Sequence, residues 1–476
     1  MNKRHLINYI LYMSCMALGA CNIPKIAEKS AAIALPQTFA GKTDSTNVAQ
    51  IDWAHYFTDP HLCTLIDSAL SHNQELNIML QEINIAGNEV HARKGEYLPF
   101  VGAKLGGGAE KRSENTPLGA SEKQIRIQEG RANPDPMPDI GLNLFATWEI
   151  DIWKKLHNAE KEARLTYLAS MEGKNFMVTN LVAEIANLYY ELLALDQQKK
   201  LINDNLKLQN DALTLVKLQK IAARVTELPV KKFEAEVLKN QSLRYKIDQQ
   251  IVETENKLNY LVGQYPQHII RNAQGLSSIQ LPVVAEGLPA QLLNNRPDVK
   301  QAELLMQAAQ LDVQVAKARF YPSLGISANL GYQAFNPAYL LKTPQSLIYS
   351  ITGDLIAPLV NKRAIEADYL TANAKQIQTV YTYEQTVLNA YVEVANHLSK
   401  FKNTAIITDL ENKQVAALTA SVQISYDLFN SAHADYMEVL MTQRDAIEAK
   451  LELIESQRAQ FNAAIGLYRS LGGGWQ

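Results

Sequence analysis

The residues best equipped for chemistry lie in one short stretch near the start of the chain. Asp52, His55, Asp59 and His61 carry carboxylates and imidazoles of the kind that ligate metal ions. Elsewhere no combination of Ser, His and Asp has a spacing that favours nucleophilic catalysis. The glycine runs at 106–108 and 472–474 lack the Gly-Lys-Ser/Thr continuation of a phosphate-binding loop. We therefore find no support for an enzyme.

Cys21 has a different potential chemistry, covalent lipidation. Lys3 and Arg4 precede an apolar stretch at 6–17 that is too short to span a bilayer, and Leu18-Gly19-Ala20-Cys21 follows it. This pattern resembles a bacterial lipobox, so we expect residues 1–20 to be a signal peptide and Cys21 to be acylated. The alternative is an ordinary secretory signal in which Cys21 is incidental. Asn22, where an Asp would favour retention in the inner membrane, favours the outer membrane.

Composition narrows the remaining choices. The chain has 46 Lys and Arg against 49 Asp and Glu, which gives no reason to expect a nucleic-acid partner. Its three cysteines are Cys15 in the signal, Cys21, and Cys63, so no disulfide framework is available. The mature chain contains no apolar window long enough for a transmembrane helix.

The two halves of the chain resemble each other. Asn73-Gln74-Glu75-Leu76 corresponds to Arg296-Pro297-Asp298-Val299, and Tyr97-Leu98-Pro99 corresponds to Phe320-Tyr321-Pro322 at the same offset. Toward the ends of the halves, Leu258-Asn259-Tyr260-Leu261 corresponds to Phe461-Asn462-Ala463-Ala464. A repeat of this length indicates a duplicated domain with internal pseudo-twofold character.

Each half is predicted to contain a pair of strands. Apolar and polar residues alternate from Leu324 to Gln333 and from Leu347 to Leu355, and again from Leu142 to Glu149, whereas 101–111 is Gly-rich and less regular. Each run has about the ten residues of a tilted membrane strand. The alternative is four strands of a soluble sandwich.

Long helices are predicted for most of the rest. Residues 359–465 contain neither Gly nor Pro, and apolar residues recur at spacings of three and four, as at Leu181, Ile185 and Leu188. A single straight helix of this length would reach about 160 Å, so we expect the chain to turn back once and form antiparallel pairs. Four strands cannot close a membrane barrel, and lipid does not tolerate an open edge, so several protomers must share one barrel.

Several motifs resemble the TolC-like outer-membrane efflux lipoproteins, the OprM/NodT group. They occur in the family's order from Ile51-Asp52-Trp53 to the C-terminus, and they are Trp148-Glu149-Ile150-Asp151-Ile152-Trp153, Asn295-Arg296-Pro297-Asp298-Val299, Ala318-Arg319-Phe320-Tyr321-Pro322-Ser323 and Leu467-Tyr468-Arg469-Ser470-Leu471-Gly472-Gly473-Gly474-Trp475. The resemblance implies a mainly α fold with a membrane β-barrel portion, in which a homotrimer builds a 12-stranded barrel on a periplasmic α-barrel.

The resemblance also implies the function. Family members are passive exit ducts in the outer membrane that dock with a periplasmic adaptor protein and an inner-membrane RND transporter, without a cofactor. The segment around Asp59 and Pro60 matches a family segment that has no metal role, so no metal site is expected. The competing hypothesis is a scaffolding envelope lipoprotein with long hairpins, which would leave the paired strands unexplained.

The periplasmic gate departs from the family pattern. Relatives carry Tyr-Leu-x-x-Leu-Asp-Ala-Gln-Arg, and this chain has Met437 for the first Leu, Met441 for the Asp, and Arg444 for the Arg. These three residues are the gate candidates. A thioether cannot replace a carboxylate in a charge-assisted bond, so Glu438 or Asp445 is the alternative partner for Arg444.

The hairpin tips depart as well. Ala223 and Ala432 stand where relatives carry a Gly that reverses the chain, so we expect a polar residue such as Asn430 or Asn210 to take the strained conformation instead. The candidate contacts with the adaptor are the tip residues, which are Arg224, Val225, Thr226, Glu227, His433 and Asp435.

The predicted organisation follows from the repeat. Residues 21–60 form a lipidated N-terminal segment and linker, 61–265 the first repeat, 266–284 an inter-repeat linker, and 285–476 the second repeat. The first repeat has strands within about 99–150 and long helices within about 154–262. The second has strands within about 322–357 and long helices within about 359–468.

Overall fold

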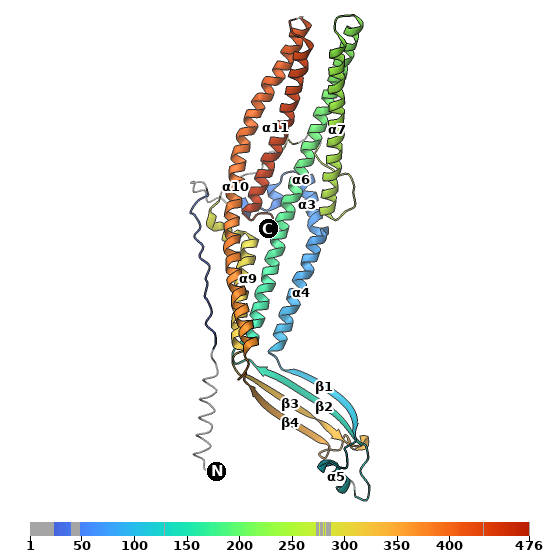
Figure 1. The fold of residues 1–476 in the computed structure, drawn as a ribbon, viewed down its shortest axis with the longest axis vertical. Coiled ribbons are helices and arrows are strands. Elements are labelled where there is room, and N and C mark those ends of the chain that lie inside the picture. The colour runs from blue at the N-terminus through green and yellow to red at the C-terminus, as the bar shows by residue number, and fades with distance from the viewer. Residues whose placement is uncertain are drawn as a thin grey trace. The chain divides into compact units, whose positions relative to one another are not determined.

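The structure is a computed structural model of the chain that describes residues 23–39, 48–127, 129–272, 276, 279, 281, 287–431 and 433–475. The predicted signal peptide and Cys21 lie outside these residues, as do Ala432 and much of the predicted inter-repeat linker. Within the described ranges, helices and four strands follow one another in two similar series (Figure 1).

The first series begins with short helical turns, η1 (Val48–Gln50) and α2 (Trp53–Tyr56), and continues through α3 (Pro60–His72) and α4 (Gln74–Glu96). It then contains β1 (Phe100–Glu110), α5 (Pro117–Gln124) and β2 (Met137–Ile150), followed by the long helices α6 (Lys155–Ile221) and α7 (Glu227–Val262).

The second series opens with η3 (Pro289–Gln291), α8 (Leu292–Asn295) and α9 (Pro297–Ala318). It continues with β3 (Ser323–Ala334), η4 (Pro337–Tyr339) and β4 (Leu347–Ile356), and it ends with α10 (Arg363–Asn430) and α11 (Tyr436–Ser470). The Pro-free and Gly-free stretch therefore turns back once, between α10 and α11.

The helix starts follow ordinary capping chemistry. The Asp59 carboxylate accepts the His61 N–H at 2.9 Å, with Pro60 as the first residue of α3. Asp435 accepts the N–H groups of Met437 and Glu438 at the start of α11. At the end of α7, Gly263 adopts a left-handed conformation with φ of 75°.

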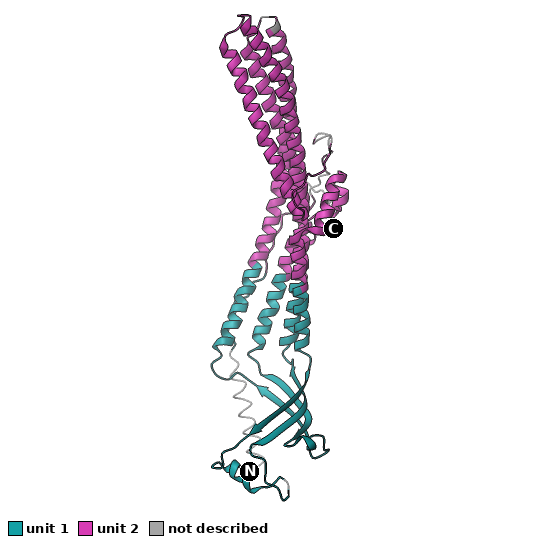
Figure 2. Ribbon diagram, turned by 90° about the vertical axis from the view of Figure 1, so that its right-hand side faces the viewer, with its two compact units in different colours: residues 1–30, 85–167, 305–380 teal, residues 31–84, 168–304, 381–476 magenta. Residues whose placement is uncertain are grey.

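The chain divides into two compact units, each made from both repeats (Figure 2). Unit 1 comprises Ile85–Tyr167 and Leu305–Val380 together with the described residues up to Ser30. Unit 2 comprises Ala31–Asn84, Leu168–Leu304 and Tyr381–Gln476. The two copies of the repeat are therefore not the two units.

Unit 1 contains the single sheet of the described chain, with antiparallel strands in the order β1-β2-β3-β4. The register pairs Leu142 with Leu105 on one side and with Tyr332 on the other, and it pairs Asn143 with Lys104 and Gly331. Most large apolar residues therefore share one face, and most polar residues lie on the other together with Phe145 and Ile348, which agrees with the alternation predicted from the sequence.

Unit 2 is held by a core between α3, α6, α7 and α11. Tyr190 of α6 stacks on Phe461 of α11 at a centroid distance of 4.5 Å, and both rings are buried. The neighbouring Tyr189 donates its hydroxyl hydrogen to Asp59 at 2.7 Å. This buried hydrogen bond ties α6 to the start of α3.

No helix among the described residues is long and apolar enough to cross a membrane.

Candidate functional site

The apolar face of the sheet is largely exposed among the residues that the structure describes. Ten of its large side chains are at least one-third exposed, and these are Val101, Leu105, Leu142, Leu144, Trp148, Leu330, Leu347, Tyr349, Ile351 and Leu355. The opposite face carries Lys104, Asn143, Thr147, Ser327, Asn329 and Ser350. An exposed apolar face on a sheet of this kind marks a surface that meets lipid or a partner.

The two edges of the sheet are also open. β1 pairs only with β2, and β4 pairs only with β3, among the strands described. Each edge is a row of backbone donors and acceptors, which is a template for another strand. The sheet is thus incomplete as a single chain.

The first hairpin tip is made by Ala223 itself. Its φ is 55°, in the left-handed region, and its N–H donates to Lys220 O at 2.9 Å while the Arg224 N–H donates to Gln219 O at 2.9 Å. These two bonds form a Schellman motif, which normally uses Gly. The expectation that a polar residue takes the strain is therefore wrong here. Asn210 lies inside α6, where its amide donates to Leu206 O.

The second tip repeats one of these bonds. The His433 N–H donates to Leu428 O at 2.9 Å, the counterpart of the bond from Arg224 to Gln219. Ala432 lies outside the described residues. Asp435 is the N-cap of α11, so its carboxylate is occupied by two backbone N–H groups.

The remaining tip candidates differ in exposure. Arg224, Thr226, Glu227 and His433 are exposed, whereas Val225 is half-buried and packs against the core of unit 2. Thr226 is the N-cap residue of α7, although its side chain makes no capping hydrogen bond. Glu227 forms an ion pair with Lys220 across the turn.

The three gate candidates share one side of α11. Met437, Met441 and Arg444 are separated by four and three residues, the spacing that aligns side chains along a helix. Met437 is half-buried with its sulfur 3.4 Å from Nζ of Lys232 on α7, and Met441 is 47% exposed. Arg444 pairs with the adjacent Asp445 at 3.2 Å, while Glu438 makes no described contact with it. This exposed pair is weak.

Asp52 and Asp59, the two aspartates of the stretch with metal-ligating residue types, have structural roles. Asp52 accepts the Ala54 N–H at the start of α2, and Asp59 caps α3 and accepts from Tyr189. Across the described ranges there is no group of three or more His, Cys, Asp or Glu side chains arranged to hold a metal ion.

The family motif at 295–299 surrounds a buried ionic cluster whose contacts sequence reasoning missed. Arg296 is 4% exposed, and it donates to both oxygens of Asp298, to Glu393 at 2.9 Å and to Ser470 O at 2.8 Å. Burial alone would lower the pKa of Arg296, but the bonds to Asp298 and Glu393 outweigh it and raise that pKa. Arg296 thus links α9, α10 and the end of α11.

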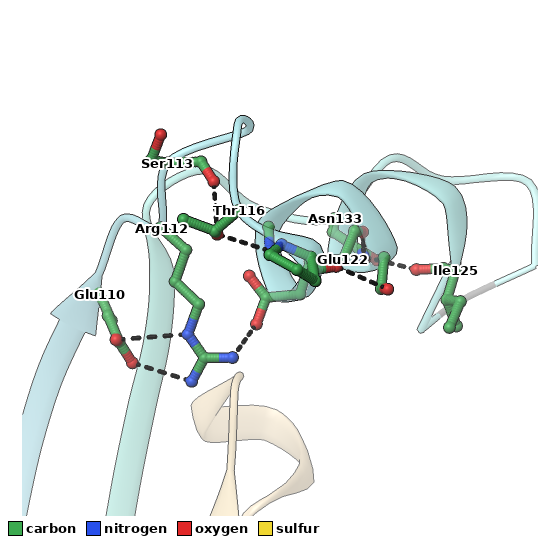
Figure 3. Close-up of polar contacts among 10 residues, drawn as sticks. Glu110, Arg112, Ser113, Thr116, Glu122, Ile125 and Asn133 are labelled. Atoms are coloured by element: carbon green, nitrogen blue, oxygen red, sulfur yellow. Dashed lines mark hydrogen bonds and ion pairs between the residues drawn. The ribbon is translucent and has the colours of Figure 1, made fainter.

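A second missed feature is the connection between β1 and β2. Here Arg112 bridges Glu110 and Glu122, Thr116 caps α5, and Asn133 binds its other end (Figure 3). The dipeptide Thr116-Pro117 is a helix-start signal that could have located α5 in the sequence.

Comparison with known proteins identifies the chain. The model of the family described as outer membrane efflux protein matches residues 65–264 and 288–473. The chain belongs to this family. The protein is therefore located in the outer membrane, with a large periplasmic part. Membership in this family favours the efflux duct over the alternative of a scaffolding envelope lipoprotein.

Individual relatives are similar over nearly their whole length. The pyoverdine export outer membrane protein OpmQ of Pseudomonas aeruginosa is 26% identical, covering 98% of this chain and 97% of OpmQ. The cation efflux system protein CusC of Escherichia coli is 24% identical, covering 97% of each. The fold resembles the open state of the Neisseria gonorrhoeae outer membrane channel MtrE, with a TM-score of 0.82 and 20% identity over 95% of this chain and 98% of that one. The mainly α fold with a β-barrel portion is confirmed.

Proposed function

We propose that this outer-membrane efflux protein works as a homotrimeric, passive exit duct, which receives substrates from an RND transporter through a periplasmic adaptor and catalyses no reaction itself. The observation that carries the proposal is the open four-stranded sheet with an exposed apolar face. Lipid requires every backbone group to be paired, so β1 of one copy must meet β4 of the next. Three copies would then supply twelve strands.

Native mass spectrometry of the detergent-solubilised protein tests the assembly. We expect the mass of three chains. A stable monomer that inserts into membranes would contradict the shared barrel, because one chain would then have to tolerate both open edges in lipid.

We also propose that the protein is lipidated at Cys21. Two residues farther on, Ile23 and then Ile26 pack against α9 and α10 beside Phe320 and Tyr369 in unit 1. The Gln376 amide donates to Lys29 O at 3.1 Å and extends this contact. Phe320 lies three residues before β3, so the N-terminal segment starts beside a membrane strand, where an acyl chain on Cys21 would reach the bilayer.

The mass of the mature chain tests lipidation. Mass spectrometry of the N-terminal fragment should find Cys21 as the first residue and a mass increase that corresponds to acyl chains. An unmodified terminus at another residue would refute the assignment.

The hairpin tips are the proposed contacts with the adaptor. Arg224 and His433 occupy equivalent, exposed positions in the two tips. A photo-crosslinking amino acid at Arg224 should capture the adaptor in cells. The same group at Tyr260, which is 67% exposed at the other end of α7, is the matched control and should capture none.

The gate is the proposed role of Met437, Met441 and Arg444. Their shared side of α11 supports a common function. With a thioether at position 441 and Arg444 already paired to its neighbour, closure would rest on apolar contact between methionines rather than on an ion pair between chains.

A further inference from the structure

The connection between β1 and β2 forms a small folded cap at one end of the sheet in unit 1. Together with the ends of the strands it lines an open cavity of about 570 Å³, a volume in the range of small-molecule sites. The lining residues come from β1, α5, β2, β3 and β4 and from the connections that follow β1 and β3.

The cap is held by specific polar contacts (Figure 3). Arg112 donates to both oxygens of Glu110 at 3.3 and 3.2 Å and to Glu122 of α5 at 2.6 Å, which ties the helix to the end of β1. The Asn133 amide donates to the carbonyls of Glu122 and Ile125 at 2.6 and 2.7 Å and accepts the Ile127 N–H at 2.9 Å. One wall of the cavity is therefore built into the fold.

The strand register places the cavity on the polar face of the sheet. Glu110 pairs with Met137, and Asp139 and Gln333 are on the same side as Asn143 and Lys104. In a membrane barrel the polar face is the one that faces the lumen. The cavity therefore opens toward the interior of the proposed duct.

The cavity has a large apolar wall. Leu118 and Ile125 of the cap line it and are 64% and 68% exposed, and Ile127 is 49% exposed. Phe335, directly after β3, and Ile348 of β4 also contribute. This apolar surface is left in water in the absence of a ligand.

The charges of the lining are unbalanced. Glu110 and Glu122 share the guanidinium of Arg112, and Asp139 accepts both of its hydrogen bonds, at 2.8 and 2.9 Å, from the neutral amide of Gln333. Within the described part of the chain no Lys, Arg or His forms an ion pair with Asp139. The lining thus holds three carboxylates and one cation.

We propose that this cavity binds amphipathic organic cations, with the apolar body against Leu118, Ile125 and Phe335 and the positive centre facing Asp139. An apolar wall does not suit a hydrated metal ion, and the described residues contain no cluster of ligands arranged for one. An anion would meet an excess of negative charge. The inference rests on the proposed duct only for its position on the exit route.

The test measures binding directly on the purified, full-length protein in non-ionic detergent. The probes are tetraphenylphosphonium and tetraphenylborate, which have nearly the same shape and opposite charges. Asp139→Asn removes the charge and keeps an acceptor for Gln333. Asp354→Asn is the matched control, because Asp354 is a carboxylate on the same polar face but does not line the cavity.

We expect saturable binding of tetraphenylphosphonium and at least about tenfold weaker binding of tetraphenylborate. Asp139→Asn should weaken cation binding about 3- to 10-fold, with a smaller effect at high salt, and Asp354→Asn should change it less than about twofold. Ile125→Ser, which alters an exposed side chain, should weaken the binding about fivefold.

Three results would overturn the proposal: no saturable binding, equal affinity for the two ions, or the same loss in Asp354→Asn as in Asp139→Asn. A cellular efflux assay separates this failure from failure of the duct. Restored efflux with a protein that does not bind the cation would reject the cavity site alone, whereas binding without restored efflux would reject the duct.

Discussion

The backbone of Ala223 has a conformation that suits glycine better. A left-handed L-residue costs about 1 kcal/mol relative to Gly, and here the two Schellman hydrogen bonds hold it in place. The same motif uses Gly263 at the end of α7 and Gly472 after α11. Among these three described turns, the first hairpin tip alone has a residue other than Gly in this position.

Replacing Ala223 with Gly should therefore stabilise the first tip. We expect a local gain of about 0.5–1 kcal/mol, seen as about 2- to 5-fold slower amide hydrogen exchange at the end of α6. Ala222→Gly is the control, because the Ala222 N–H makes a helical bond to Leu218 O and Gly there should speed exchange. Equal effects of the two substitutions would mean that left-handed strain is unimportant at this tip.

Met441 offers a second test at the scale of one residue. Met441→Asp would place a carboxylate three residues from Arg444 on the same side of α11, and across the proposed trimer it restores the family's ion pair. Closure should strengthen by about 0.5–3 kcal/mol and lower the conductance of the trimer in planar bilayers. Adding Arg444→Ala should reverse the change. Unchanged conductance in all three forms would move the gate away from this segment.

The backbone conformation of the first hairpin tip was only partly predictable from the sequence. The absence of Gly at position 223 was visible, but whether Ala itself or a neighbour adopts the left-handed conformation depends on the hydrogen bonds of the finished turn. The partner of Arg444 was similarly left open between Glu438 and Asp445, and the structure pairs Arg444 with the adjacent Asp445.

At the scale of elements, His397 of α10 is packed against the backbone of α11. A Cβ at Gly466 would overlap its ring, and its Nδ1 is buried without a hydrogen-bond partner among the described residues. Burial lowers the pKa of His397, and the nearby Arg469 and Lys400 lower it further, against an opposing effect of Glu393.

This contact predicts a loss of stability in acid. Because the pKa of His397 is lower in the folded chain than its ordinary value of 6.5, the unfolded chain binds the proton more readily as the pH falls below about 6.5. The apparent melting temperature should therefore drop between pH 7.5 and 5.5, and His397→Gln should reduce that drop. The control is His91→Gln, at an exposed site on α4, which should leave it unchanged. An identical drop in both variants would exclude His397 as its source.

The strands were more predictable than the cap that joins two of them. Alternation identifies the faces of β2, β3 and β4 because each side chain meets either an apolar or a polar environment along its whole strand. The folded connection between β1 and β2 depends instead on Arg112 reaching across to Glu122, a contact between residues that no periodicity brings together.

At the scale of the whole molecule, the duplication predicts the series of elements but not the compact units. Each unit takes its segments from both copies, so neither repeat contains a complete core of its own. In unit 2, for example, Tyr190 of the first copy needs Phe461 of the second. How the sheet is completed is left open by a single chain, and the family resemblance is the basis for the proposed trimer.

The contacts between the two ends of the sequence have a consequence for the order in which the protein matures. Tyr56 stacks on Tyr468 at 3.9 Å and donates its hydroxyl hydrogen to Ala464 O, while Tyr468 donates to Ile51 O at 2.6 Å. A segment that is synthesised early thus finds its partners in one that is synthesised much later. The segment around Tyr468 must cross the inner membrane before this part of the core can close, and until then its apolar surfaces stay open to periplasmic chaperones and proteases. A protein truncated before Tyr468 would therefore be removed during export rather than fail later as a channel.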